Sequence, residues 1–300
     1  MTRLREPAGA AVPEISLDGL IERYDGFLLD AYGVLVHGEG IMPGARETID
    51  RLKRAGKPWF ILTNDASQLP QNAAARYRRR GLAIDPAVIL GSGLLLEPYF
   101  EKCGLKGARC AVLGPADSER YVRIAGGRVV PVEADFEVLV IGDETGYPFL
   151  PTIDAALSSL FRRLDKGRTV QLIVPNPDLI YPSGDGYGLA AGSIALMLEA
   201  ALARRYPDRS DLKFARLGKP EPHLYREAIA RIGSRNVVMI GDQLETDIAG
   251  ANAAGIDSVL LATGVSRIDF SAIAPELRPT WWMASLLNES PTDASSEAKG

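Results

Sequence analysis

Gly26-Phe27-Leu28-Leu29-Asp30, followed by Ala31-Tyr32-Gly33-Val34, is the stretch that decides the fold of this chain. A short apolar run that ends in a carboxylate and a glycine-containing loop is typical of a buried parallel strand. A second apolar run, Trp59–Leu62, stops at Thr63-Asn64, and another, Val237–Ile240, ends at Gly241-Asp242. Since ligands of open α/β sheets bind beyond the carboxyl ends of the strands, we expect these loops to meet at one site.

Helices are expected between the strands. Pro43-Gly44-Ala45 opens one that runs through Arg54, because proline is favoured at a helix start and Ala45, Ile49 and Leu52 keep helical spacing. Further helices are predicted at 67–80, 152–164, 193–205, 222–232 and 248–254, and further strands at 88–90, 109–113, 137–141, 170–174 and 258–261. Residues 280–287 suit a last edge strand or a helix, and residues 175–192 read as a loop at a domain crossing.

Strands that alternate with helices predict an α/β fold, a doubly wound parallel sheet covered by helices on both faces. A chain of 300 residues suits about two domains. We expect a core domain of residues 1–104 and 187–290, interrupted by an inserted α/β domain of residues 105–186. The polar residues 291–300 are expected to form a disordered tail.

The bulk properties are those of an ordinary globular protein, and they exclude several classes. The net charge of −4 does not suit an electrostatic nucleic-acid binder. No apolar stretch approaches the roughly 18 residues of a membrane helix, and the N-terminus lacks an apolar signal core. Cys103 and Cys110 are the only cysteines, which fits a reducing compartment. We therefore expect a cytoplasmic protein with no nucleic-acid or membrane partner.

Carboxylates follow two of the predicted strands. Asp30 could attack phosphorus or hold a divalent cation, although an Asp at a strand end can also cap a turn. Asp242 and Asp247 suit Mg²⁺, a hard cation that prefers oxygen ligands. Asp247 could instead, or in addition, cap the helix that is expected to begin at Ile248.

Phosphate-binding groups stand elsewhere in the chain. Thr63 offers a hydroxyl and Asn64 an amide at the end of the second strand. Lys219, in Gly218-Lys219-Pro220, offers a positive charge for a phosphate. Each of these segments taken alone would also fit an ordinary turn, and it is their combination that points to phosphoryl transfer.

The combination resembles the haloacid dehalogenase superfamily, whose phosphatases use an Asp nucleophile, a Thr or Ser, a Lys and an acidic metal pair in this order. The finer resemblance is to class IIA, which includes pyridoxal-phosphate, phosphoglycolate, para-nitrophenyl-phosphate and sugar-phosphate phosphatases. It covers roughly residues 24–287. The motifs that carry it are Gly33-Val34-Leu35, Pro43-Gly44-Ala45, Leu62-Thr63-Asn64, Asn176-Pro177-Asp178, Gly218-Lys219-Pro220 with Pro222, Gly241-Asp242, Glu245-Thr246-Asp247 and Thr263-Gly264-Val265-Ser266.

The resemblance implies a Rossmann-like core, an inserted cap that closes over the substrate, and a Mg²⁺-dependent phosphatase of a small phosphorylated metabolite. Asp30 would be the nucleophile and Lys219 would neutralise the phosphate. The metal would be held by Asp30, Asp242 and the backbone carbonyl of Tyr32, with Asp247 in support. Relatives of this kind often form dimers through the cap, so a homodimer is a further expectation.

Other residues receive their expected roles from the same resemblance. Thr63 and Asn64 would bind the phosphate. Asn176 and Asp178 would have a substrate-side or hinge role, unless they only shape the turn around the neighbouring prolines.

Tyr32 departs from the family pattern, which has a second Asp two residues after the nucleophile. That Asp protonates the leaving group and then activates water, whereas a phenol with a pKa of about 10 is a poor base at neutral pH. General acid–base catalysis contributes about 10²–10⁴-fold. The sequence therefore favours a slow phosphatase, or one that forms a phospho-enzyme and stalls. Two alternatives are a phospho-ligand-binding or regulatory protein without turnover, and an enzyme that cleaves carbon–phosphorus or carbon–halogen bonds.

Several residues could compensate for Tyr32 or meet the substrate. Asp65 stands where the subfamily has a second Asn and lies near enough in sequence to reach the site, but the favoured interpretation is that it caps the following helix. His37 lies in the first loop and could also serve, but a lone loop histidine is more often a surface residue, and His223 is expected to be structural. Asp143-Glu144-Thr145 and Gly184–Gly188 are further candidates for contact with the substrate.

Overall fold

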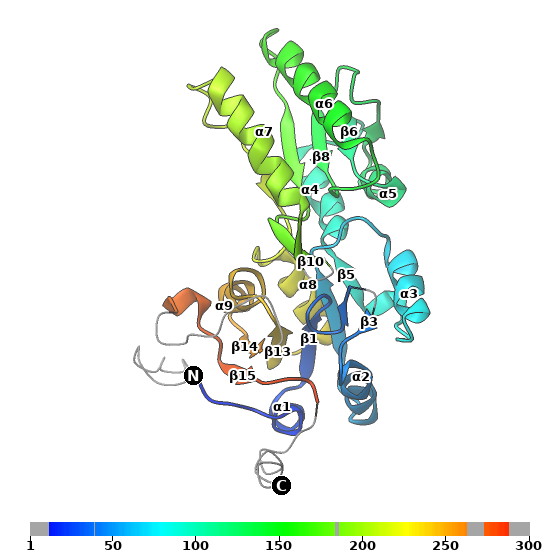
Figure 1. The fold of residues 1–300 in the computed structure, drawn as a ribbon, viewed down its shortest axis with the longest axis vertical. Helices are drawn as coiled ribbons and strands as arrows, with labels where there is room; N and C mark the ends of the chain where they lie inside the picture. Colours follow the sequence, from blue (N-terminus) through cyan, green and yellow to red (C-terminus); the bar gives the residue numbers. More distant parts are fainter. Residues whose placement is uncertain (1–11, 39, 184–185, 263–272, 288–300) are drawn as a thin grey trace. The chain divides into compact units, whose positions relative to one another are not determined.

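The computed structural model describes residues 12–38, 40–183, 186–262 and 273–287 (Figure 1). The chain divides into two compact units, the first made of Met1–Phe60 and Ala228–Gly300, the second of Ile61–Glu227. The boundaries fall inside strand β4 (Trp59–Thr63) and inside helix α8 (His223–Ile232). Among the described residues, no helix combines the length and apolar character needed to cross a bilayer.

The first unit is built on a parallel sheet with the strand order β15-β14-β13-β1, followed by β4, which begins in this unit. β1 pairs with β13 in the register Gly26↔Val237 to Leu29↔Ile240. All residues of both strands are buried, as their apolar sequences predict. The sheet strands are β1 (Gly26–Asp30), β13 (Val237–Gly241), β14 (Asp257–Leu261) and β15 (Trp281–Met283).

Short elements complete the first unit. The predicted helix after Pro43 is confirmed as α2, and the C-terminal segment forms a strand, β15, which pairs in parallel with β14. An antiparallel pair, β2 with β3, follows the first loop. The bounds are α1 (Leu17–Arg23), β2 (Val36–His37), β3 (Gly40–Ile41), α2 (Ala45–Arg54), α9 (Ala249–Ala254) and the 3₁₀ turn η4 (Pro275–Leu277).

The second unit begins with the rest of β4, which pairs in parallel with β5. A five-stranded sheet follows, with the order β12-β9-β8-β6-β7, and all of its pairs are parallel. Its elements are α3 (Pro70–Arg79), η1 (Pro86–Val88), β5 (Ile89–Gly91), η2 (Ser92–Leu95), α4 (Leu96–Cys103), β6 (Arg109–Leu113), α5 (Ala116–Ile124), β7 (Arg128–Val129), β8 (Val138–Ile141), α6 (Phe149–Leu164), β9 (Gln171–Val174), α7 (Ala191–Arg205) and β12 (Ala215–Arg216).

Helices cover both faces of the five-stranded sheet. Alternate strand residues such as Leu139 and Leu172 share one hydrophobic cluster with α6 and α7. Figure 1 shows these two helices beside the sheet. On the other face, Cys110 of β6 lies beside Val122 of α5 and Phe100 of α4, around Gly127. The predicted α/β fold with parallel sheets and flanking helices is confirmed. The division into a core and an inserted cap stays a prediction.

The interpretation of residues 175–192 as a loop was wrong. They contain an antiparallel hairpin of β10 (Ile180–Ser183) and β11 (Gly186–Leu189), with Ile180 opposite Leu189. Their glycine- and proline-rich composition is typical of a loop, but Tyr181 in β10 and Tyr187 in β11 supply strand propensity. Such a short hairpin is specified by the pairing of its two halves, which a local pattern does not reveal.

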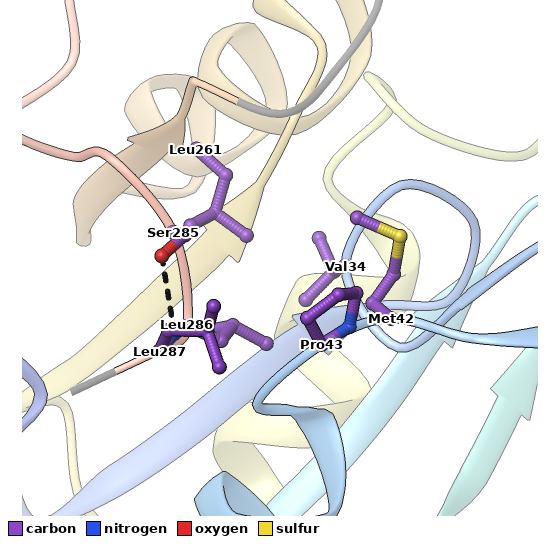
Figure 2. A pocket seen from close by; sticks show the side chains of 7 residues that line it. All are labelled: Val34, Met42, Pro43, Leu261, Ser285, Leu286 and Leu287. Atoms are coloured by element: carbon purple, nitrogen blue, oxygen red, sulfur yellow. Dashed lines mark hydrogen bonds between the residues drawn. The ribbon is translucent and has the colours of Figure 1, made fainter. Parts of the chain in front are cut away.

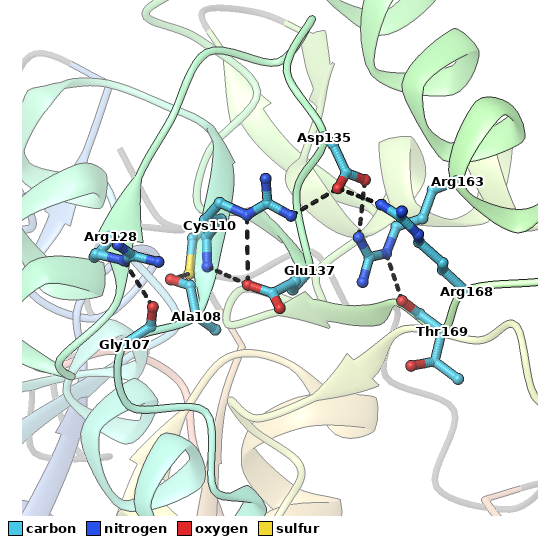
Figure 3. Close-up of polar contacts among 10 residues, drawn as sticks. Gly107, Ala108, Cys110, Arg128, Asp135, Glu137, Arg163, Arg168 and Thr169 are labelled. Carbon is cyan, nitrogen blue, oxygen red and sulfur yellow. Dashed lines mark hydrogen bonds and ion pairs between the residues drawn. The ribbon is translucent and has the colours of Figure 1, made fainter. Parts of the chain in front are cut away.

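An ion-pair network joins the elements of the five-stranded sheet. The Asp135 carboxylate accepts hydrogen bonds from Arg109 at 2.6 Å, Arg163 at 2.8 Å and Arg168 at 3.0 Å (Figure 3). Arg163 is buried and also donates to the Thr169 carbonyl. The hydrogen bonds and charges of Arg163 and Arg109 lower the pKa of Asp135 to about 2.

Replacement of Asp135 by Asn is expected to lower the free energy of unfolding by about 1–2 kcal/mol at pH 7, because a buried Arg163 loses its partner while solvent screens the rest of the network. A carboxylate whose pKa is lowered in the folded protein stabilises the fold at pH values above its ordinary pKa of about 3.9. That contribution is lost as the pH falls from about 4 to about 2, so the difference between the proteins should shrink there. Urea unfolding at pH 7 and pH 3 measures the difference in the free energy of unfolding between the variant and the wild type. Asp154→Asn, at an exposed position, is the control. If Asp135→Asn and Asp154→Asn lose the same free energy of unfolding, the stabilising role of the ion-pair network is contradicted.

Candidate active site

Three buried carboxylates lie together in the first unit. One oxygen each of Asp30, Asp242 and Asp247 can be chosen so that all three lie within 4.8 Å of one another. Asp30 is the last residue of β1, and Asp242 follows the last residue of β13. Because these strands are parallel neighbours in register, their carboxyl ends bring the two side chains to the same edge. The predicted proximity of the three carboxylates is thus a consequence of the sheet topology.

Asp247 is positioned by an unusual turn. Leu244–Ile248 forms a π-helical turn, η3, which leads directly into α9. The Asp247 carboxylate accepts hydrogen bonds from the backbone N–H groups of Asp242 and Gln243, both at 3.2 Å. Its bonds therefore reach back to the strand end, and the interpretation of Asp247 as a cap for a helix beginning at Ile248 was wrong. Turns of this type are rare and occur often at functional sites.

The loop after β1 lies against these carboxylates. Gly33 has a φ of +81°, and its N–H donates to the Val36 carbonyl at 2.9 Å. A Cβ on Gly33 would overlap the Asp242 carboxylate, so the backbone approaches that group as closely as glycine allows. Tyr32 is half-buried and forms a β-bridge with Val36. Carboxylates beside a backbone turn are the oxygen-rich surroundings that Mg²⁺ prefers.

If Mg²⁺ binds at Asp30, Asp242 and Asp247 and so raises Tm, the substitution Gly33→Ala is expected to abolish that rise, because the added methyl group would displace the Asp242 carboxylate. Gly38→Ala is the matched control. Gly38 also has a positive φ, +35°, but a Cβ there would meet no described atom within 4 Å. Each variant should lose about 1–2 kcal/mol of stability from the left-handed backbone. If both variants keep the metal response, the close approach at Gly33 has no bearing on metal binding.

A second group of predicted site residues lies in the second unit, around the side chain of Asn64. Its Nδ2 donates to the Asp178 carboxylate at 2.8 Å and to the Lys219 carbonyl at 3.1 Å. Its Oδ1 accepts the backbone N–H of Lys219 at 2.7 Å. Asn64 and Lys219 are both buried, with 3% of each exposed. The amide therefore ties the lysine segment to the strand end that carries Thr63.

The topology of the second unit explains this convergence. Asp178 follows β9, and Lys219 follows β12, the parallel neighbour of β9. Both loops leave from the carboxyl edge of the five-stranded sheet, where Asn64 meets them. Gly218 is required there, since a Cβ would overlap the Asn64 Oδ1. Sequence reasoning missed Ser92, whose buried hydroxyl donates to the Asn64 carbonyl at 2.7 Å. Its only sequence signal was the strand-then-loop pattern at Gly91-Ser92-Gly93.

Asp65 has a defined partner. Its carboxylate accepts from the Ser67 N–H at 2.8 Å and forms an ion pair with Arg76 of α3 at 2.7 Å. It does not cap α3, whose N-cap residue is Leu69, so that interpretation was wrong. The bond from the Asp65 N–H to the Thr63 hydroxyl, at 3.2 Å, holds the two residues together.

The remaining candidates divide into loop-shaping and surface residues. Asn176 Oδ1 accepts the backbone N–H of Asp178 at 3.0 Å, which fits the turn-shaping interpretation. His37 and His223 are exposed. Gly184-Asp185 and the motif Thr263–Ser266 lie outside the described residues.

Asp143 and Glu144 have perturbed acidities. Burial raises the pKa of Asp143, although the hydroxyl and N–H of Thr145 donate to its carboxylate. Burial, followed by the charge of Asp143, raises the pKa of Glu144 to about 7, and the charges of Asp65 and Asp178 add to this. Both carboxyl groups are therefore easier to protonate than ordinary exposed acids.

The described residues thus form two groups. Asp30, Asp242 and Asp247 lie with the Tyr32–Gly33 turn in the first unit. Thr63, Asn64, Asp65, Asn176, Asp178 and Lys219 lie in the second.

Comparison with protein families identifies the kind of protein that shares these features. A model described as haloacid dehalogenase-like hydrolase matches residues 27–128, and a second, HAD-hydrolase-like model matches residues 216–289. Dihydroxyacetone phosphatase of Corynebacterium glutamicum is 30% identical over 243 residues, which cover 80% of this chain and 82% of that protein.

Solved structures agree. A possible sugar phosphatase of the HAD superfamily from Cytophaga hutchinsonii has a TM-score of 0.81 and 30% identity, covering 93% of this chain and all of that one. Glycerol phosphate phosphatase of Mycobacterium tuberculosis, crystallised with magnesium, has a TM-score of 0.75 and 25% identity, covering 89% of this chain and 77% of that one.

Proposed function

Because the chain belongs to the haloacid dehalogenase-like hydrolases, in their class IIA, we propose that it is a Mg²⁺-dependent phosphatase acting through an aspartyl-phosphate on Asp30. It is a phosphoric monoester hydrolase by family, and its substrates are small phosphorylated metabolites, as the names of its relatives indicate. The observation that carries the mechanism is the buried cluster of Asp30, Asp242 and Asp247. Three carboxylates in close contact repel one another unless a cation or proton offsets their charge.

The donor set fits Mg²⁺. Asp30, Asp242 and the Tyr32 carbonyl would hold the ion, and Asp247 would support it by fixing the Asp242 backbone. The bound ion would polarise a phosphoryl oxygen and offset its charge. A related phosphatase was crystallised with magnesium, which supports the choice of metal.

The protein side chains would carry the chemistry. The Asp30 carboxylate attacks phosphorus, the ester P–O bond breaks, and water then hydrolyses the aspartyl-phosphate. Thr63 and Asn64 bind the phosphoryl group, and Lys219 neutralises its charge. Since Asn64 also bonds both backbone polar groups of Lys219, it would set the position of that lysine. Asp65 and Asn176 each fix a local turn, and through these turns they would complete the binding site for the phosphate and the substrate.

Tyr32 favours a second candidate function, a phospho-ligand-binding or regulatory protein. A phenol at this position can donate a proton but is a poor base for the attack of water on the aspartyl-phosphate. Such a protein would bind a phosphorylated metabolite with Mg²⁺ and release phosphate slowly or not at all. The homodimer and the cytoplasmic location stay predictions.

Phosphate release from a panel of phosphorylated metabolites, measured with Mg²⁺ and with EDTA, tests the two functions. The phosphatase proposal expects turnover of at least one small phosphomonoester that stops when the metal is chelated. Mg²⁺-dependent binding without turnover on any panel member would favour the binding protein instead. Turnover that is unchanged in EDTA would contradict the proposed metal role.

A further inference from the structure

Three hydroxyl groups hold the backbone of the Asn64 segment, which we define as residues 64–69. The segment follows β4 and lies outside any helix or strand, so its backbone polar groups need partners from other elements. Every second carbonyl of the segment, from residue 64 to residue 68, accepts a hydrogen bond from a hydroxyl. The donors and their acceptor carbonyls are Ser92 to Asn64 at 2.7 Å, Ser118 to Ala66 at 3.0 Å and Tyr121 to Gln68 at 2.9 Å.

Strand register explains the position of the first donor. β4 pairs in parallel with β5, and Thr63 lies opposite Gly91. Asn64 and Ser92 are the next residues along the two strands, so they leave the sheet side by side. The Ser92 hydroxyl is therefore bonded to the residue whose side chain contacts the lysine segment.

The other two donors share one face of α5, because Ser118 and Tyr121 are three residues apart on this helix. Close packing fixes both side chains. A Cβ on Gly114 or Gly142 would overlap Ser118, and a Cβ on Gly93 would overlap the Tyr121 ring. All three donors are at most 3% exposed. Burial raises the pKa of the Tyr121 phenol, so its hydroxyl keeps the proton that it donates.

A carboxylate of the same helix holds the far end of the Asn64 segment. Asp117 accepts the backbone N–H of Leu69 at 2.9 Å and the side-chain amide of Asn72 at 2.5 Å. Its other oxygen accepts from Arg120 at 2.8 Å. All of these residues belong to the second unit, so the bracing of the segment is internal to one compact body.

We propose that Ser92, Ser118 and Tyr121 are positioning residues for phosphate binding. They fix the backbone of the Asn64 segment, and the Asn64 side chain in turn accepts the Lys219 N–H at 2.7 Å and donates to the Lys219 carbonyl at 3.1 Å. The proposal rests on the proposed function, in which the asparagine and the lysine bind the phosphoryl group.

Removal of one hydroxyl deprives a carbonyl of this donor, and the segment shifts or admits water to replace the lost bond. A shift of residue 64 weakens the bonds between its side chain and Lys219. The effect should be largest for Ser92, which bonds to residue 64 itself, and smaller for Tyr121, which bonds to residue 68.

Amide hydrogen exchange tests the positioning without any need for turnover. The Lys219 N–H should exchange at least about 10-fold faster in Ser92→Ala than in the wild type, and about threefold faster in Tyr121→Phe. The Gln171 N–H, which donates to the Glu137 carbonyl at 2.9 Å within the five-stranded sheet, is the reference and should keep its rate. Because Tyr121→Phe keeps the buried ring, it decides the test if Ser92→Ala does not fold.

Calorimetric titration with inorganic phosphate in the presence of Mg²⁺ tests the link to the ligand. The Kd of phosphate should rise at least about 10-fold in Ser92→Ala, as expected for the loss of one buried hydrogen bond. Ser159→Ala and Tyr206→Phe are the matched controls. Each removes a hydroxyl that bonds elsewhere in the second unit, to Arg162 at 2.6 Å and to Asp165 at 2.7 Å. Both controls should keep the wild-type Kd.

Equal acceleration of the Lys219 and Gln171 amides would assign the hydroxyls a general structural role and overturn the proposal. A wild-type Kd of phosphate in both Ser92→Ala and Tyr121→Phe would also overturn it. If the wild-type protein shows neither phosphate binding nor turnover, the proposed function fails and the inference fails with it. The exchange rates distinguish the two failures, because the Lys219 amide should respond to the substitutions even in a protein that binds no phosphate.

Discussion

Asp30→Asn should lower kcat for para-nitrophenyl phosphate with Mg²⁺ by at least about 10⁴-fold, because an amide cannot form the aspartyl-phosphate. Asp30 is the last residue of a fully buried strand, so its carboxylate is held by β1 and its neighbour β13. Asn has nearly the same shape, and removal of one of three adjacent negative charges should leave the fold intact. Stopped-flow and steady-state assays measure the loss, and circular dichroism checks the fold.

The control for this experiment is Asp50→Asn, an exposed position on α2 of the same unit. It should leave kcat and Tm unchanged. Acid quenching of the wild-type enzyme with labelled substrate should trap phosphate on the protein, and Asp30→Asn should trap none. Turnover that persists in Asp30→Asn would remove the proposed mechanism, since no other residue is assigned as the nucleophile.

Asp242→Asn should weaken Mg²⁺ binding at least about 100-fold. The substitution removes a charged oxygen from a hard-cation site, and changes beyond the direct ligands already cost about 10–100-fold. The rise in Tm with Mg²⁺ should therefore require about 100 times more metal, because ligand stabilisation follows RT ln(1 + [L]/Kd). Without metal, the variant should be as stable as the wild type or more stable, because the carboxylates Asp30 and Asp247 lose a like-charged neighbour.

Glu245→Gln is the matched control for the metal experiment. It lies in the same π-helical turn as Asp247, but its side chain is exposed. It should keep the wild-type Mg²⁺ titration of Tm. An unchanged titration in Asp242→Asn would show that this carboxylate is not a ligand, and the metal site would then need another location.

Local patterns were sufficient to predict most of the elements. The apolar runs at β1 and β13 are fully buried strands, and the helical spacing after Pro43 gives α2. These predictions succeed because a buried parallel strand or an amphipathic helix has a period that is visible within a few residues. The hairpin β10–β11 was missed because its stability depends on pairing between two halves that are weak alone.

For the candidate site, too, the sequence predicted some features correctly and others wrongly. Residue types and their order identified Asp30, Thr63 and Lys219, because phosphoryl transfer needs a nucleophile, hydrogen-bond donors and a cation. The roles of Asp65 and Asp247 as helix caps were wrong, because both carboxylates bond elsewhere, to Arg76 and to the strand-end N–H groups. A short polar residue near a helix start has several partners within reach, and only the folded backbone selects among them.

The sequence by itself determined which side chains stand at the strand ends, because strand and loop patterns depend on neighbouring residues. Only the tertiary structure decided what these side chains touch. The contact of Asn64 with Asp178 and Lys219 arises between distant segments, and the π-helical turn aims Asp247 back at residue 242. Their geometry follows from strand register and backbone hydrogen bonding, which no local stretch of sequence encodes.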